Sequence, residues 1–221
     1  MEPLAWYRIA IPVAACVALG MAARYGHARF RFAGMGLIAG VCFGVLQDQV
    51  SARLCPEYFT LFHPPIPGLN DPTLMGISWG FLGAWWAGLF LGYAAGLVAT
   101  FGTLPKLTPR DVVRHLLFLM LYVGATVSAI GGIVWWHAEL LGVSIDPGLG
   151  RLLPPEHHRA LLVVSCYHFA AYASSLCGSV VLCAWIWRER VKRRAAMLAA
   201  PSTQVPQSID RTFEPNNSLK D

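Results

Sequence analysis

Charged residues are scarce in this sequence. Only 13% of its 221 residues are Asp, Glu, Lys or Arg, whereas 56% are apolar. Soluble domains contain about 25% charged and roughly 45–50% apolar residues. A soluble fold needs more charge than this to cover its surface, so we expect a membrane protein. Segments of about ten residues that alternate apolar and polar side chains are also missing, which argues against a transmembrane β-barrel.

The motifs of common enzymes and metal sites are missing as well. The six cysteines have no CxxC spacing, and the seven histidines have no HxxxH or HExxH spacing. No phosphate-binding loop and no nucleophile–base pair stands out. The sequence therefore predicts no enzymatic activity and leaves any cofactor unknown. The net charge of +5 comes from short basic clusters at the ends of apolar segments, so no nucleic-acid partner is expected.

Long apolar runs dominate what remains. Runs of about 20 residues can cross the roughly 30 Å of hydrocarbon in a bilayer. We expect an all-α membrane protein, a bundle of five transmembrane helices, or four if the first is cleaved or peripheral. The bundle would occupy residues 1–198, followed by a disordered cytoplasmic tail at 199–221. The expected helices cover about 7–23, 32–53, 72–100, 109–138 and 156–188.

The basic residues indicate an orientation. With five crossings, three basic clusters fall on one face of the membrane, and the loops on the other face carry most of the acidic residues. The positive-inside rule then places the N-terminus outside and the C-terminus in the cytoplasm. The three clusters are Arg24, Arg29 and Arg31; Lys106, Arg110 and Arg114; and the basic residues of 188–194.

Small residues recur every four positions in the apolar segments. Lipid tails are as apolar as leucine, so helices associate in membranes where small side chains let their backbones approach closely. The pattern predicts a glycine zipper and a central place for the helix at 72–100. The glycines expected at helix contacts are Gly36, Gly40, Gly44, Gly76, Gly80, Gly88, Gly92 and Gly96.

Three polar residues fall inside or near the apolar segments. Asp48 lies near the outer end of the second helix, and His168 lies about ten residues into the last helix, with Tyr172 on the same face. Ionisable residues inside membranes are functional hypotheses by default. They form a candidate polar site that faces a cavity, although Asp48 as an interfacial cap and His168 as a neutral, hydrogen-bonded core residue are alternatives.

Further histidines and carboxylates gather on the predicted outer side. His63 and Glu57 lie in the loop after the second helix, and His137 ends the fourth. Imidazole and carboxylate groups together can hold zinc, copper or iron. A metal or haem site that combines His168 with His63 or His137 is therefore one hypothesis, and interfacial polar caps are the other.

The loop at 53–73 is rich in proline and aromatic residues. Pro56-Glu57 predicts a short helical turn, and the prolines after it stiffen the return, so we expect an ordered cap over the outer mouth of the bundle. Its motifs resemble those of a family of uncharacterised bacterial multi-pass membrane proteins, which carry a D-Q and P-E-Y-F-T loop before a glycine-rich W-W helix. The matching residues are Gln47-Asp48-Gln49-Val50, Cys55-Pro56-Glu57-Tyr58-Phe59-Thr60, Gly80, Trp85-Trp86 and Gly88-Leu89.

The resemblance covers about residues 34–187 and implies a bacterial inner membrane. Within that setting, we expect a non-enzymatic structural or accessory component of the cell envelope. Its surroundings would be the lipid bilayer, with a membrane-protein partner or a second copy of the chain. Two alternatives stay open: a metal- or haem-binding redox protein that uses the outer histidines, and a small transporter with Asp48 and His168 in its pathway.

Overall fold

The computed structural model describes residues 6–26 and 28–200 and contains only helices and loops in that part of the chain. Four helices in these two described ranges are long and apolar enough to cross a membrane, and a shorter apolar helix precedes them. This confirms the all-α, multi-pass membrane protein predicted from composition. The elements are α1 (Tyr7–Tyr25), α2 (Ala28–Leu54), α3 (Glu57–Phe62), α4 (Pro72–Thr100), α5 (Pro109–His137), α6 (Pro147–Gly150), η1 (Pro155–His157) and α7 (His158–Ala199).

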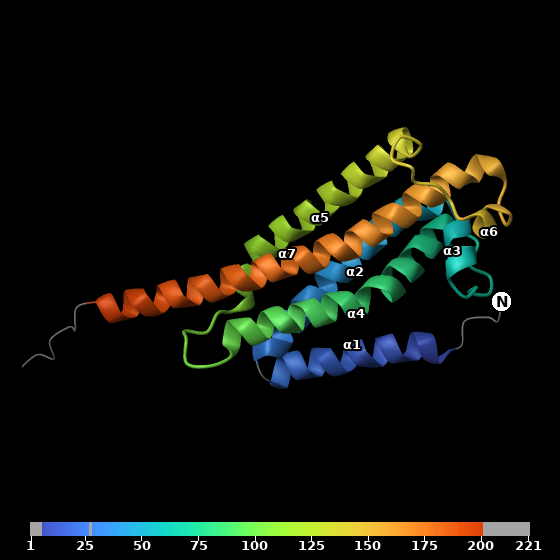
Figure 1. The fold of residues 1–221 in the computed structure, drawn as a ribbon. Coiled ribbons are helices and arrows are strands. Elements are labelled where there is room, and N and C mark those ends of the chain that lie inside the picture. The colour runs from blue at the N-terminus through green and yellow to red at the C-terminus, as the bar shows by residue number, and fades with distance from the viewer. Residues whose placement is uncertain (1–5, 27, 201–221) are drawn as a thin grey trace, which may run out of the picture.

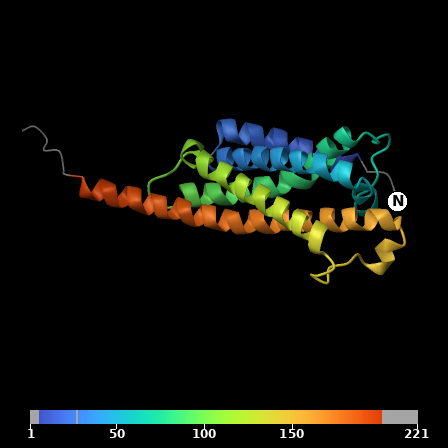
Figure 2. The same ribbon diagram turned by 90° about the horizontal axis from the view of Figure 1, so that it is seen from above.

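The long helices form two closely packed pairs, α2 with α4 and α5 with α7. Figure 1 shows the four helices running side by side, with α1 along the edge of the first pair. The view from above in Figure 2 shows α7 as the longest element, reaching well beyond the bundle at one end. The cap helix α3 and the short α6 lie at the opposite end.

Local capping explains where two of the long helices begin. Asp71 Oδ1 accepts a hydrogen bond from the Leu74 N–H at 2.9 Å, and Pro72 occupies the first helical position. At the start of α5, Asp111 Oδ2 accepts from the backbone N–H of Thr108 at 2.7 Å. Both arrangements satisfy donors that have no partner within the helix. The starts of α4 and α5 predicted from these residues are therefore confirmed.

Glycines let the backbones of α2 and α4 touch. A Cβ atom built on Gly36 would lie 2.6 Å from the Cα of Gly92, and one on Gly80 would lie 2.5 Å from the Cα of Val45. No real side chain tolerates such distances to backbone atoms, so these positions admit only glycine without a shift of the helices. α4 also contacts α1 and α7, as predicted for a helix with more than one partner, but α2 contacts still more elements.

Two helices extend beyond their expected limits. α2 begins at Ala28 rather than near residue 32, and α7 continues to Ala199 rather than ending near residue 188. The extension of α7 is held by Arg193, whose Nη2 lies 2.9 Å from Asp111 Oδ1 and whose Nε lies 3.1 Å from Glu189 Oε1. The expected disordered tail lies outside the described residues from 201 on.

Arg190 ties the same part of α7 to the end of α4. Its side chain is completely buried. Its guanidinium group donates to the carbonyls of Phe101 at 2.7 Å, Pro105 at 2.9 Å and Leu104 at 3.0 Å, and also to Val98. The last carbonyls of a helix have no partner within it and carry the negative end of its dipole, so a buried cation is stabilised there.

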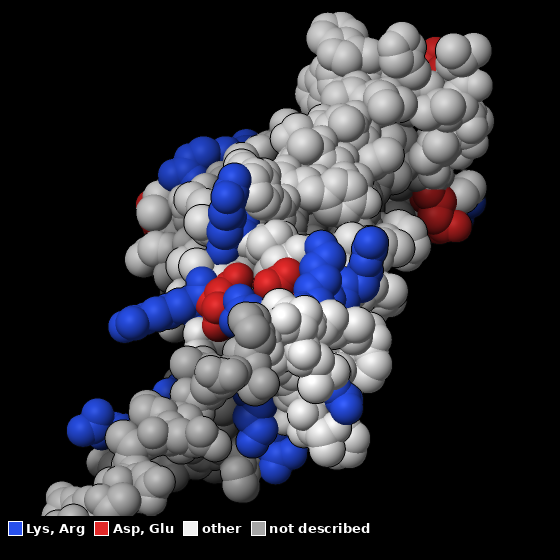
Figure 3. Space-filling view, turned by 90° about the vertical axis from the view of Figure 1, so that its left-hand side faces the viewer, with Lys and Arg blue, Asp and Glu red and all other residues white. Residues whose placement is uncertain are grey.

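Basic side chains gather at this end of the bundle. The end of α1 and start of α2, the α4–α5 loop and the end of α7 all lie there (Figure 1). Figure 3 looks onto that end and shows lysine and arginine side chains around a smaller acidic patch. The three basic clusters named from the sequence therefore share one end of the molecule, opposite the cap helix α3.

Candidate functional site

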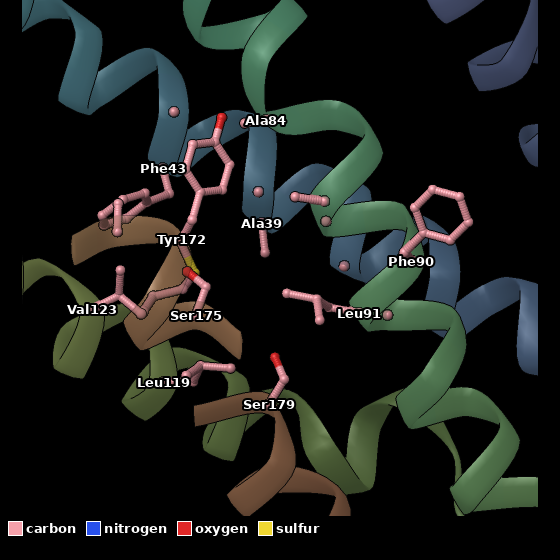
Figure 4. Close-up of a pocket in the computed structure, with 18 of the residues that line it drawn as sticks. Ala39, Phe43, Ala84, Phe90, Leu91, Leu119, Val123, Tyr172, Ser175 and Ser179 are labelled. Carbon is pink, nitrogen blue, oxygen red and sulfur yellow. The ribbon is translucent and has the colours of Figure 1, made fainter. Parts of the chain in front are cut away.

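A cavity of about 350 Å³ separates the two helix pairs. Residues of α2, α4, α5 and α7 line it, and most of them are apolar. Figure 4 shows Ala39, Leu91, Leu119 and Ser179 around the space. Asp48 and His168 line one part of the cavity, and Phe32 lines another part of the same α2 wall. Its volume is within the range of about 300–1,000 Å³ that is typical of small-molecule sites.

Asp48 and His168 meet at the wall of this cavity. His168 Nε2 lies 2.9 Å from Asp48 Oδ1. Only 6% of the Asp48 surface is exposed, and the His168 side chain is 14% exposed. The sequence indicated both residues as separate members of a polar site, and the structure brings them into direct contact.

The hydrogen-bond partners show how many protons this pair holds. His168 Nδ1 lies 2.9 Å from the carbonyl oxygen of Val164, which can only accept a hydrogen bond. Nδ1 must therefore carry a proton, and one more proton must lie between Nε2 and Asp48. The pair is either imidazolium with carboxylate or neutral histidine with carboxylic acid. In both forms it holds one exchangeable proton and has no net charge.

Ser51 and Tyr167 extend the network, and sequence reasoning missed both. Ser51 Oγ lies 3.3 Å from Asp48 Oδ1 and 2.7 Å from the hydroxyl of Tyr167. Among the described residues, Ser51 forms no hydrogen bond with His168, so the serine–histidine contact of a nucleophilic triad is not formed. Their positions in the sequence could have indicated both residues, because Ser51 lies one helical turn after Asp48 and Tyr167 directly precedes His168.

The cap covers the pair. α3 begins at Glu57, as Pro56-Glu57 predicted. The ring of Tyr58 stacks on the ring of His168, with centroids 4.5 Å apart, and His63 lies against Trp79, with centroids 4.4 Å apart. Phe59 is buried at 2% exposure and anchors the cap. The expected ordered cap is therefore present, and its aromatic rings lie over the Asp48–His168 pair.

The remaining predicted residues lie in different places. Tyr172 lines the cavity, where its hydroxyl donates to the Gly83 carbonyl at 3.0 Å. Glu57 contacts His157 Nδ1 at 2.8 Å rather than the central pair. His137 is exposed at the end of α5. Within residues 6–26 and 28–200, no three His, Cys, Asp or Glu side chains are arranged to hold a metal ion.

His63 gives the cap a pH dependence. Burial in the closed cap lowers the pKa of His63 below its ordinary value of 6.5, while Asp48 and His168 act on it in opposite directions. The open cap then binds a proton more tightly than the closed cap, so the closed cap loses stability as the pH falls below about 6.5. We expect faster backbone hydrogen exchange over residues 55–70 at pH 5.5 than at pH 7.5, after correction for the intrinsic exchange rate.

His157 of η1 also contacts Glu57 of the cap, so the control must isolate His63. His63→Phe keeps an aromatic ring against Trp79 and removes the titrating group. The pH dependence that comes from His63 should disappear in this variant. A variant with the full wild-type pH dependence would show that another group is responsible.

Comparison with protein-family models, curated proteins and solved structures gives no match. The function is therefore inferred from the geometry of the cavity and its polar pair.

Proposed function

We propose that this chain is a small transporter of a bacterial inner membrane, which passes a small, mainly apolar molecule through the cavity and couples its passage to the proton of the Asp48–His168 pair. The observation that carries this proposal is the pair itself. It is a proton-sharing contact, at the wall of an apolar cavity, between two helices that are far apart in the sequence. Ionisable residues inside membranes mark substrate pathways and proton relays.

The extent of the cavity supports passage rather than storage. Asp48 and the half-buried Met35 both line it, and they are thirteen residues apart on α2, which corresponds to about 20 Å at 1.5 Å per residue. The hydrocarbon core is about 30 Å thick. A molecule in the cavity can therefore reach most of the way across the membrane without leaving the protein.

The polar groups on α7 form a second line of support. Tyr172, Ser175 and Ser179 line the cavity below His168 at spacings of three and four residues. Such spacings place side chains on one face of a helix. The opposite wall is the glycine-rich contact of α2 and α4, which we interpret as a glycine zipper that keeps this wall rigid. The α7 wall therefore carries polar groups, and the α2–α4 wall opposite is rigid.

The basic end of the bundle supports an orientation with the C-terminus in the cytoplasm and the cap outside. The resemblance to bacterial multi-pass proteins supports an inner-membrane setting. The accessory role expected from the sequence stays a prediction, and it requires no ligand in the cavity. The metal- or haem-binding alternative gains no ligand set from the described residues.

The first test asks whether the cavity binds a molecule. Protein is purified in a mild detergent, and co-purifying small molecules are extracted and identified by mass spectrometry. Ala39 points into the cavity (Figure 4), so Ala39→Phe should fill it and reduce the bound molecule by at least about tenfold. Ile38 is 63% exposed and does not line the cavity. Ile38→Phe is therefore the matched control and should keep the molecule.

The second test asks whether binding is coupled to a proton. The identified molecule is added to proteoliposomes that contain a pH-sensitive dye and little buffer. Wild-type protein should give flux that responds to an imposed pH gradient, and Asp48→Asn should lose this response because its amide cannot exchange the proton. Absence of both a bound molecule and a flux would exclude the transporter and favour the accessory role.

A further inference from the structure

We infer that the molecule bound in this cavity is an uncharged, membrane-soluble alcohol or phenol whose hydroxyl donates a hydrogen bond to Oδ2 of Asp48. Its apolar part would lie along the cavity toward Leu119 and Leu182, which line the same space. This inference rests on the proposed function and adds the chemical class of the molecule.

The first argument is an unused acceptor. Asp48 Oδ1 receives both hydrogen bonds of the carboxylate, from His168 and from Ser51. Oδ2 accepts none from the described residues, although Asp48 is only 6% exposed and lines the cavity. Oδ2 is not fully enclosed by protein atoms, so it is open to accept a hydrogen bond from a molecule in the cavity. A ligand group with an O–H in this place would satisfy it.

The second argument is charge. Among the described residues, Asp48 and His168 are the only members of the cavity lining with an acidic or basic side chain; the rest are apolar, hydroxyl-bearing or amide residues. The pair has no net charge, as its hydrogen-bond partners show. A charged ligand would therefore enter an apolar space without a counter-ion, which is unfavourable inside a membrane. A neutral ligand that carries one donor matches both the charge and the unused acceptor.

The third argument is access. The cavity lining includes side chains of α4 and α7 that are also exposed on the outer surface of the bundle. Trp86 and Tyr172 stack with centroids 5.9 Å apart, and both are 45% exposed; Phe90 and Leu176 are more exposed still. Figure 4 shows Tyr172 and Phe90 on opposite sides of the space. This surface faces lipid, so a molecule dissolved in the bilayer can reach the cavity between α4 and α7.

The test compares two probes that differ at one oxygen, which carries a hydrogen in the first and a methyl group in the second. 4-Octylphenol and its methyl ether, 4-octylanisole, have the same ring and alkyl chain, but the ether has no O–H. Binding to the wild-type protein is measured by calorimetry in detergent, with protein-free micelles as the reference for partitioning. We expect the phenol to bind at least about tenfold more tightly, because hydrogen bonds to charged groups are among the stronger ones.

A double variant shows whether the preference for the phenol over the ether comes from the Asp48–His168 pair. Asp48→Ala with His168→Phe removes both polar partners, so no buried charge stays unpaired, and the phenyl ring can still stack on Tyr58. The variant should bind the phenol and the ether equally. Because the comparison of the two probes is made on the wild-type protein, it decides the inference even if this variant does not fold.

The outcomes separate the two proposals. Equal binding of phenol and ether to the wild-type protein would overturn the hydroxyl contact and leave cavity binding intact. Tighter binding of octylammonium than of the phenol would overturn the neutral ligand class. Binding of neither probe would also overturn this class, and the co-purification experiment with Ala39→Phe and Ile38→Phe then shows whether the cavity binds another molecule or none.

Discussion

Replacing His168 with leucine lowers the free energy of unfolding by about 3–5 kcal/mol, because it removes one partner of a buried, proton-sharing pair and leaves the other without its hydrogen bond. Asp48 would keep only the hydrogen bond from Ser51. Asp48→Asn should cost much less, about 1 kcal/mol. Its amide N–H can donate to Nε2 of a neutral His168, whose Nδ1–H continues to donate to the Val164 carbonyl.

The measurement is unfolding of the purified protein by increasing fractions of sodium dodecyl sulfate in mild detergent, followed by tryptophan fluorescence. The asymmetry between the two variants is the decisive result, since both replace one member of the same pair but only Asp48→Asn can keep a hydrogen bond between the two positions. Similar losses in His168→Leu and Asp48→Asn would show that the proton does not lie where the hydrogen-bond partners place it. The double variant Asp48→Ala, His168→Phe should recover most of the stability lost in His168→Leu.

Gly36→Leu disrupts the contact between α2 and α4 and lowers the free energy of unfolding by about 3 kcal/mol. A Cβ atom at this position would meet backbone atoms of Gly88 and Gly92, with 2.6 Å to the Cα of Gly92. Backbone cannot move aside as a flexible side chain can, so the two helices must separate. Because their contact forms one wall of the cavity, ligand binding should be lost as well.

Gly34→Leu is the matched control. Gly34 lies two residues earlier on the same helix, and a Cβ atom there would have no neighbour within 4 Å. The same substitution should leave the stability of this variant close to that of the wild type, as measured in the same unfolding experiment. Equal destabilisation at the two positions would mean that a general effect of leucine on α2, rather than the contact with α4, causes the loss.

The candidate site was predictable in its members but not in its arrangement. Asp48, His168 and Tyr172 stand out because polar groups are expensive inside a membrane. The contact between Asp48 and His168 joins residues 120 positions apart, and it depends on how two helices rotate about their axes and which faces they present. Sequence reasoning therefore grouped His137 with the outer histidines, although it lies exposed at the end of α5, and it missed Tyr167, which is buried in the network.

The sequence by itself determined features that depend on residues close together in the chain. Asp71, Thr108 and Asp111 set the starts of two helices through hydrogen bonds within a few residues. The apolar runs indicated where the long helices lie, and the glycines spaced by four indicated contact surfaces, because both follow from helical geometry and from lipid as the solvent.

Tertiary structure decided what depends on contacts between distant segments. Only packing shows that α7 continues to Ala199 because Arg193 reaches Asp111, or that Arg190 is buried against the carbonyls of the α4–α5 region. Only packing also places a cavity between the two helix pairs and brings Asp48 and His168 together at its wall. The physical reason is that these energies depend on distances between side chains far apart in the chain, which spacing along one helix does not specify.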